Sequence, residues 1–250
     1  MLRDNCVVML ILFALMVIDM NDSPCNQDYV TVDGRTITYF HTPAEHREAP
    51  VLFILHGHDF SAKPASYKNK DWHVVCPMDR FGIKGGGSWY LGEDGDFFWI
   101  EGMRKIVQRL RDQGTRDVYF WGSSMGGYGA LLHGYLNHAK AIYANIPQTR
   151  LLGTSYSDNG MKKYFEKIFG VNVGKCNDLR AVISKDVGCY YFLCFNQLEK
   201  NDYFAEQCLP FVLHLNSIGA PMYLEVRPLD SHSKNHGIGE TISLFERFGC

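Results

Sequence analysis

The sequence predicts an α/β fold, in which a mostly parallel sheet carries helices on both faces. Residues 51–57 (VLFILHG) and 73–79 (HVVCPMD) are continuous apolar runs, as expected of strands buried on both sides in a parallel sheet. Further along the chain, short apolar runs alternate with segments of helical spacing, the order typical of parallel strands joined by helices. A chain of 250 residues can bury one large core, so a single folded domain is sufficient.

The individual elements follow from local patterns. Residues 29–40 predict a hairpin, because two β-branched, alternating runs flank the turn pair Asp33-Gly34. Residues 99–111 predict a helix with one apolar face. The remaining expected elements are strands at 117–121, 141–147, 190–195 and 222–226 and helices at 128–137 and 239–248.

One stretch interrupts the alternation of strands and helices. Residues 150–186 are polar and helix-prone, with MKKYFEKIFG in the middle. They predict a small cap-like insertion within a domain that covers residues 26–250. The alternative is an ordinary crossover helix with long loops.

The N-terminal residues 1–25 form a hydrophobic leader. Residues 7–18 carry no charge, but twelve residues are too few to span a bilayer, which needs about 20. They fit the apolar core of a secretory signal or anchor, although Arg3 is the only basic residue before them and no small-residue cleavage site follows. The alternatives are a buried strand, or a start at Met16 or Met20. The protein is exported or membrane-tethered if the segment is a signal and cytoplasmic otherwise.

Charge and cysteine content limit the kinds of partner and cofactor that we expect. The formal net charge is −2 and no run of Lys or Arg is present, so we expect no nucleic-acid partner. Eight cysteines occur without a C-x-x-C pair, which excludes a zinc ribbon or a thioredoxin motif. Most of them are expected to be buried thiols, and no cofactor or metal is expected.

The strongest chemical signal is the stretch 118–134, VYFWGSSMGGYGALLHG. It contains G-x-S-x-G with Ser124 at the centre, between a strand-like run and a helical one. In a nucleophile turn of this kind the residues two before and two after the serine must be small, which Gly122 and Gly126 satisfy. Ser123 does not fit, because Trp121 and Met125 would take the small positions. Ser124 is therefore the predicted nucleophile.

A second turn supplies the predicted oxyanion hole. LHGHD, residues 55–59, ends the strand at 51–57, and backbone N–H groups just beyond such a strand join the one after the nucleophile. We assign the oxyanion hole to the amides of His58 and Met125. The alternative is that His56 and His58 bind a metal, as in the H-x-H-x-D-H motif of metallo-hydrolases. The sequence does not match that motif, because Asp59 follows His58 directly and no His follows Asp59.

The acid and the base are expected after the last two strands, in the chain order Ser, acid, His. Asp202 is the favoured acid and His232 the favoured base, with Glu199 and His236 as second choices. His232 lies six residues past the last strand, a suitable length for reaching the nucleophile. The carboxylate would hold the imidazole in the tautomer that accepts the serine proton.

The loop 81–99 is rich in glycine and aromatic residues. It lacks G-x-x-x-x-G-K-[ST], so a phosphate-binding P-loop is excluded. We expect Trp89 and Tyr90 to line the substrate entrance, where aromatic rings suit a sugar or an acyl chain. The alternative is a long loop pinned by buried aromatics.

On these residues the chain resembles the α/β-hydrolase superfamily over positions 29–250. Four segments, DRFG…GSWYLG, GSSMGGYGAL, NIPQTRL and NDYF, are similar to capsular-polysaccharide biosynthesis proteins of the XcbB/CpsF type and to the acetyltransferase component of accessory secretion systems. The resemblance implies action on a glycan, by removal or transfer of an acetyl group.

Three functions follow as hypotheses. The first is a serine esterase that forms an acyl-enzyme on Ser124 and releases it with water. The second is an O-acetyltransferase, in which a hydroxyl of a surface polysaccharide or glycoprotein glycan replaces water. The third is a non-catalytic glycan-assembly subunit that keeps the fold.

Overall fold

The computed structural model describes residues 25–59 and 65–250. Within these residues eight strands form one sheet in the order β1-β2-β4-β3-β5-β6-β7-β8. All strands from β4 to β8 in this order run parallel, and the β1–β2 hairpin adds on antiparallel at one edge. The predicted α/β fold is confirmed. The leader predicted at residues 1–25 lies outside the described residues except for Cys25.

The strands occupy the expected positions. Their bounds are β1 Asn26–Val32, β2 Arg35–Thr42, β3 Val51–Leu55, β4 His73–Pro77, β5 Val118–Ser123, β6 Ala141–Asn145, β7 Tyr190–Asn196 and β8 Met222–Arg227. The predicted hairpin is confirmed, with Val32 paired to Arg35 across Asp33 and Gly34. Both turn residues have positive φ, 47° and 78°, the conformation that a tight two-residue hairpin turn requires.

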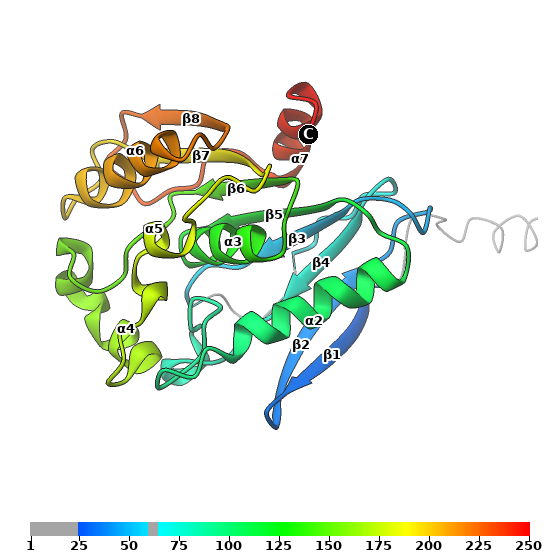
Figure 1. Cartoon of the computed structure of the whole chain (residues 1–250), viewed down its shortest axis with the longest axis horizontal. Helices are drawn as coiled ribbons and strands as arrows, with labels where there is room; N and C mark the ends of the chain where they lie inside the picture. The colour runs from blue at the N-terminus through cyan, green and yellow to red at the C-terminus, as the bar shows by residue number, and fades with distance from the viewer. Residues whose placement is uncertain (1–24, 60–64) are drawn as a thin grey trace, which may run out of the picture.

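Helices cover both faces of the sheet. The longer ones are α2 Phe98–Asp112, α3 Met125–Leu136, α4 Lys162–Phe169, α6 Leu209–Ser217 and α7 Ile238–Arg247. Figure 1 shows α2 and α3 along the near face, with α7 on the opposite side. On the α2 and α3 side, Phe53 stacks on Phe120 with ring centroids 4.7 Å apart. On the other side, Tyr119 meets Phe245 of α7 at 5.3 Å.

Alternation along each strand explains why both faces are apolar. All five residues of β3 are buried, because odd and even positions face different helical layers. In β5, Phe120 belongs to the core on the α2 and α3 side, whereas Tyr119 and Trp121 belong to the core beneath α7. The continuous apolar runs in the sequence are therefore the expected signature of a sheet covered on both sides.

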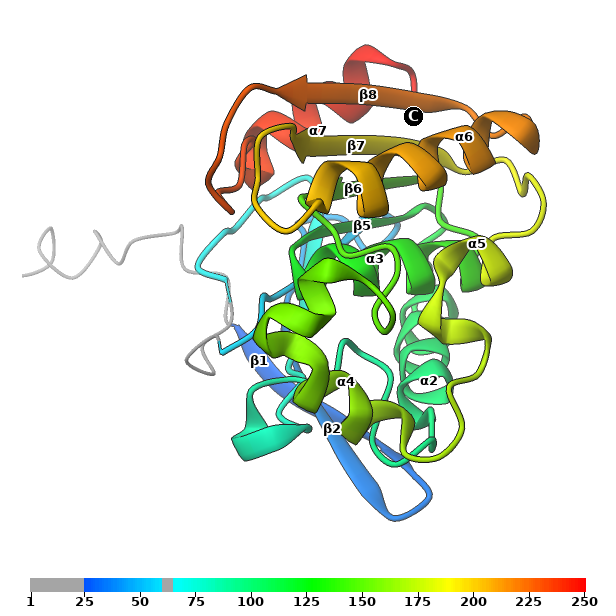
Figure 2. The same ribbon diagram turned by 90° about the vertical axis from the view of Figure 1, so that its left-hand side faces the viewer.

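Residues 150–186 follow β6 and form short helical segments at the carboxyl edge of the sheet (Figure 2). They comprise η2 Ser157–Met161, α4, η3 Lys175–Asn177 and α5 Leu179–Val182. Two aromatic residues of α4 contact loops on that edge: Tyr164 meets His58 at 4.5 Å and Phe165 meets Trp89 at 4.9 Å between ring centroids. That this segment acts as a cap stays a prediction.

A buried histidine on α3 should make folding stability depend on pH. His133 is fully buried, and burial lowers its pKa from 6.5 to about 4. Between pH 4 and 6.5, His133 is therefore protonated in the unfolded chain and neutral in the folded chain. The free energy of unfolding should fall by about 1.4 kcal/mol per pH unit for this group as pH drops from 6.5 toward 4.

His133→Gln should remove this contribution to the pH dependence of the free energy of unfolding, measured by urea denaturation at a series of pH values from 4 to 7. Glutamine can still donate to the carbonyl of Tyr90, which His133 Nε2 contacts at 2.7 Å. The control is His46→Gln at an exposed position, which should leave the slope unchanged. An equal slope in wild type and His133→Gln would contradict the assignment.

Candidate active site

Ser124 lies on the tight turn between β5 and α3. Its backbone has φ 56° and ψ −121°, a strained conformation for a residue with a side chain. The Ser124 N–H donates to the carbonyl of Asn145 at 2.9 Å, which fixes the turn to the neighbouring strand β6. This turn places the Ser124 hydroxyl at the carboxyl edge of the sheet, the position expected of a nucleophile turn.

Two glycines allow this turn to form. A Cβ at Gly122 would collide with the carbonyl of Gly126, and a Cβ at Gly126 would collide with the carbonyl of Leu55. Both obstacles are backbone atoms, which cannot move aside as a flexible side chain could. The two glycines are required by space and not by their own dihedral angles.

Gly126→Ala should lower the free energy of unfolding by about 1–3 kcal/mol, because the methyl group enters filled space. Chemical denaturation of the variant measures the effect. Gly239→Ala is the matched control, since its Cβ would meet only the ring of Tyr67 at 3.8 Å. It should leave stability unchanged or raise it by up to about 1 kcal/mol through helix propensity. Equal effects at the two positions would contradict this account of the turn.

A chain of hydrogen bonds links Ser124 to a histidine and a carboxylate. Ser124 Oγ and His232 Nε2 are 2.8 Å apart, and His232 Nδ1 and Glu199 Oε1 are 2.6 Å apart. Glu199 can only accept at Nδ1, so Nδ1 carries the proton and Nε2 accepts from the serine hydroxyl. The side chain of Glu199 is 7% exposed and that of His232 is 33% exposed.

The loop that carries His232 is anchored to the end of β7. Asn196 Nδ2 donates to the carbonyls of Ser231 and Ser233 at 2.6 and 3.1 Å, on either side of the histidine. The imidazole contacts the rings of Tyr156 and Tyr203, with centroids 6.2 and 5.9 Å away, and these two rings lie 6.2 Å from each other. Burial, with a smaller effect of the Glu199 charge, raises the pKa of Tyr156 to about 12, so its phenol stays neutral.

The preference for Asp202 as the acid is corrected. Asp202 is exposed and accepts from Ser155 Oγ at 3.2 Å, whereas the carboxylate that meets His232 is the second choice, Glu199. The reason is backbone pairing past the end of β7. Gln197 and Leu198 continue to pair with the end of β8 and the residues just past it, with N–H donors 2.7 and 3.0 Å from the carbonyls of Arg227 and Leu229.

Glu199 therefore leaves the sheet beside the His232 loop. Asn201 and Asp202 then both adopt positive φ, 64° and 52°, and turn the chain into the helical segment η4 Phe204–Cys208. That turn carries the Asp202 side chain away from the imidazole.

His236, the second-choice base, is engaged elsewhere. Its Nε2 lies 2.7 Å from Glu225 Oε2 on β8, and its ring meets that of Tyr143 on β6. The structure places His232, and not His236, at the serine.

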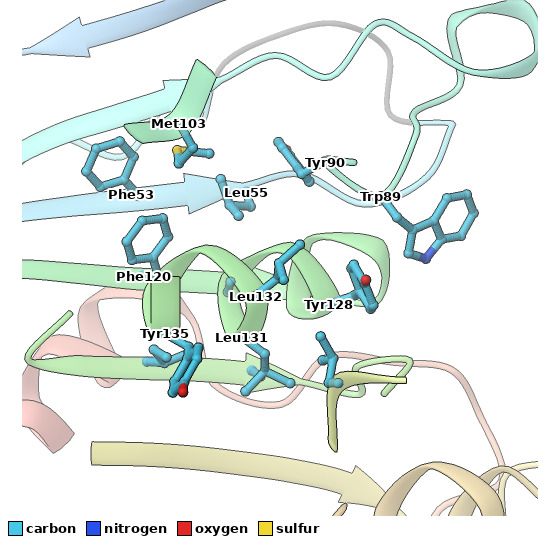
Figure 3. Close-up of a cluster of buried hydrophobic side chains, with 14 of the residues drawn as sticks. Phe53, Leu55, Trp89, Tyr90, Met103, Phe120, Tyr128, Leu131, Leu132 and Tyr135 are labelled. Atoms are coloured by element: carbon cyan, nitrogen blue, oxygen red, sulfur yellow. The ribbon is translucent and has the colours of Figure 1, made fainter. Parts of the chain in front are cut away.

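The expected position of Trp89 and Tyr90 is corrected as well. They are only 1% and 0% exposed and belong to the core beside α2 and α3 (Figure 3). The buried carboxylate of Asp79 holds their loop, since Oδ2 accepts the N–H groups of Ser88 and Tyr90 at 2.7 and 2.8 Å. The loop is thus pinned by buried aromatics, and the two rings do not form an exposed entrance.

The two turns assigned to the oxyanion hole meet beside the serine. Met125 is the first residue of α3, and Gly57, which precedes His58, lines the same pocket as Ser124. The ring of His58 packs against Trp89 and Tyr164. Burial lowers the pKa of His58, which favours the neutral ring. The assignment of the His58 and Met125 amides to the oxyanion hole stays a prediction.

A residue without a predicted role also contacts Ser124. Gln148 is fully buried after β6, and its Nε2 donates to Ser124 Oγ at 3.3 Å. It lies in the NIPQTRL segment, and its position just past the carboxyl end of a parallel strand was the signal available for it.

A pocket of about 890 Å³ opens beside Ser124 and His232. Its walls are largely apolar, and its described lining contains two lysines, Lys68 and Lys234, and no carboxylate. The apolar lining residues include Ile54, Cys76, Trp121, Ile146 and Ile238. The pocket is large enough for an acyl chain or a small alcohol group.

The part of the chain that the structure describes contains neither a metal-binding cluster nor a membrane-spanning helix. Over residues 25–59 and 65–250, no three His, Cys, Asp or Glu side chains are grouped so that they could hold a metal ion. None of the helices in these ranges combines the length and apolar character needed to cross a bilayer.

No family model and no curated protein matches the chain. Solved structures do. The acylaminoacyl peptidase of Pyrococcus horikoshii superposes with a TM-score of 0.65 at 19% identity, over 94% of this chain and 43% of the peptidase chain. This chain thus spans about two fifths of the peptidase.

Two smaller proteins match over most of both chains. An S-formylglutathione hydrolase from Agrobacterium tumefaciens has a TM-score of 0.61 at 15% identity, covering 89% of this chain and 91% of that one. Acetyl xylan esterase 1 from Thermoanaerobacterium sp. has a TM-score of 0.59 at 15% identity, covering 92% and 84%. At such low identity the likeness concerns the fold, and the chain has the α/β-hydrolase fold.

Proposed function

We propose that this protein is a serine hydrolase that cleaves esters through a covalent acyl-enzyme on Ser124. The observation that carries the proposal is the hydrogen-bonded series from Ser124 Oγ to His232 to Glu199, with distances of 2.8 and 2.6 Å. A serine hydroxyl is a weak nucleophile until an adjacent base removes its proton. The pocket beside these groups gives an ester access to the hydroxyl.

The proposed reaction has two halves. In the first, Ser124 Oγ attacks the ester carbon, His232 Nε2 takes the hydroxyl proton, and the same proton passes to the alcohol oxygen as it leaves. In the second, water attacks the acyl carbon and gives a proton to His232, which returns it to Oγ as the acyl–oxygen bond breaks. Glu199 would stabilise the imidazolium that forms in each half.

The developing negative charge on the carbonyl oxygen needs donors. We assign them to the backbone N–H groups of Met125 and His58. The Met125 amide lies at the N-terminus of α3, where the helix dipole favours an anion.

The same residues would also permit a second function, the transfer of an acetyl group to a glycan hydroxyl. Hydrolysis is favoured because the His232 side chain is one-third exposed, so water can reach the base. Trp89 and Tyr90 are buried, so they do not form the aromatic substrate entrance that suited a sugar ligand.

Labelling with a fluorophosphonate tests the proposal. Mass spectrometry should locate the phosphonyl group on Ser124 in the wild type and in Ser123→Ala, and find none in Ser124→Ala. Labelling should proceed in parallel with loss of p-nitrophenyl acetate hydrolysis. If Ser124 stays unlabelled in folded protein, the enzyme hypothesis is rejected. The remaining hypothesis is then a non-catalytic subunit with this fold.

A further inference from the structure

The hydroxyl of Ser124 has a second partner besides the histidine. Gln148 Nε2 lies 3.3 Å from Ser124 Oγ, on the side chain of a residue that is fully buried. A hydroxyl has one proton to donate and two lone pairs that accept. The contact with a buried amide therefore bears directly on which way the serine proton points.

The orientation of the Gln148 amide follows from its other contact. Trp89 Nε1 lies 3.1 Å from Gln148 Oε1. An indole nitrogen can only donate, so the atom facing it must be the carbonyl oxygen. The NH₂ group consequently faces Ser124. The chemistry of the tryptophan settles the amide orientation.

Trp89 is itself held rigidly. Its φ is 53°, and the residues before and after it donate N–H groups to the buried carboxylate of Asp79. The ring of Phe165 on α4 packs edge-on against the indole at 4.9 Å. A buried series of contacts thus runs from Asp79 through the 88–90 loop to Trp89, then Gln148, then the nucleophile.

We propose that Gln148 is a catalytic residue that donates a hydrogen bond to the nucleophile oxygen, and that Trp89 is the positioning residue that keeps its amide in that orientation. This inference rests on the proposed function of Ser124. Because Gln148 occupies one lone pair of Oγ, the hydroxyl proton is directed to His232 Nε2, which is the productive arrangement.

The same donor acts in the second half of the reaction. There Oγ is the leaving group: the bond between Oγ and the acyl carbon breaks, and Oγ keeps the electron pair and recovers a proton from His232. The incoming water supplies the hydroxyl of the acid product. Negative charge that develops on Oγ before the proton arrives is stabilised by the Gln148 N–H.

The test combines four variants. Gln148→Met keeps a side chain of similar length without a donor, and should lower kcat by roughly 10- to 100-fold with little change in KM. Trp89→Phe frees the amide to rotate and should lower kcat by about 3- to 10-fold. Trp99→Phe is the matched control, because Trp99 is also fully buried and its indole N–H has no partner among the described residues. It should keep kcat within about twofold.

Gln148→Glu separates hydrogen bonding from packing. A glutamate has the shape of glutamine, yet its ionised form only accepts and would compete with His232 for the serine proton. Its protonated form can donate again. The activity of Gln148→Glu relative to Gln148→Met should therefore rise as pH falls from 9 to 5.

Two results would overturn the inference: wild-type kcat in Gln148→Met, or a pH-independent ratio between the two Gln148 variants. Active-site titration with the fluorophosphonate counts the folded, competent sites, so kcat refers to these alone. If wild-type Ser124 does not react with the fluorophosphonate at all, the proposed function fails first. If Ser124 reacts and Gln148→Met remains fully active, only the role of Gln148 fails.

Discussion

Replacing His232 with alanine is expected to lower kcat for p-nitrophenyl acetate by about 10⁴-fold, with KM changed far less. The imidazole is the group within hydrogen-bond distance of Ser124 Oγ that can accept its proton, since Gln148 presents a donor to the same oxygen. Without a base, the serine must attack as a neutral hydroxyl. Steady-state kinetics of the purified variant measure the loss.

His236→Ala is the matched control for that loss. Both histidines lie in the same loop and both contact a glutamate. His232 contacts Glu199, whereas His236 is hydrogen-bonded to Glu225 on β8. Its removal should change kcat by less than about threefold while costing up to about 1 kcal/mol of stability. A large loss in His236→Ala with His232→Ala near wild type would transfer the role of base to His236.

The fold could be predicted because its determinants are local in sequence. The run VLFIL at residues 51–55 is apolar throughout, and every one of these residues is buried in β3. The turn pair Asp33-Gly34 set the register of the hairpin. Gly122 and Gly126 flank Ser124 at the spacing that the turn requires, and both are confined by neighbouring backbone. Each of these features is visible within a few residues of chain.

The choice between Glu199 and Asp202 as the partner of His232 was not local, and the sequence could not decide it. Glu199 and Asp202 lie three residues apart after the same strand. The bonds of Gln197 and Leu198 to Arg227 and Leu229 decide which carboxylate meets the histidine. These partners are about 30 residues away in the chain, so no spacing rule within 190–204 reveals them.

The position of the loop 81–99 also depends on contacts that the local sequence does not reveal. Its glycines and aromatics were typical of a substrate entrance. Nothing nearby in sequence indicated that a buried Asp79 carboxylate would accept from three donor groups of Ser88 and Tyr90. Burying a carboxylate is favourable only when such donors satisfy it. Trp89 was therefore expected to line the substrate entrance, whereas the structure places it behind Gln148, one residue removed from Ser124.

Glu199→Gln is expected to lower kcat by about 10²- to 10⁴-fold. The Glu199 side chain is 7% exposed, so its charge acts on the imidazolium with little screening by water. Glutamine can still accept from Nδ1 through its oxygen, but it is neutral, and its amide can also rotate to present a donor. Either change weakens the stabilisation of the imidazolium in the transition state. KM should change little, because Glu199 is not among the residues that line the pocket.

Asp202→Asn provides the comparison, since it makes the same change from carboxylate to amide three residues away. Asparagine tolerates the positive φ of 52° at this position, so the turn into η4 should persist. Asp202 contacts Ser155 and not His232, so kcat should stay within about threefold of wild type. A loss in Asp202→Asn that matched or exceeded the loss in Glu199→Gln would return the role of acid to Asp202. It would also require the loop after β7 to rearrange when substrate binds.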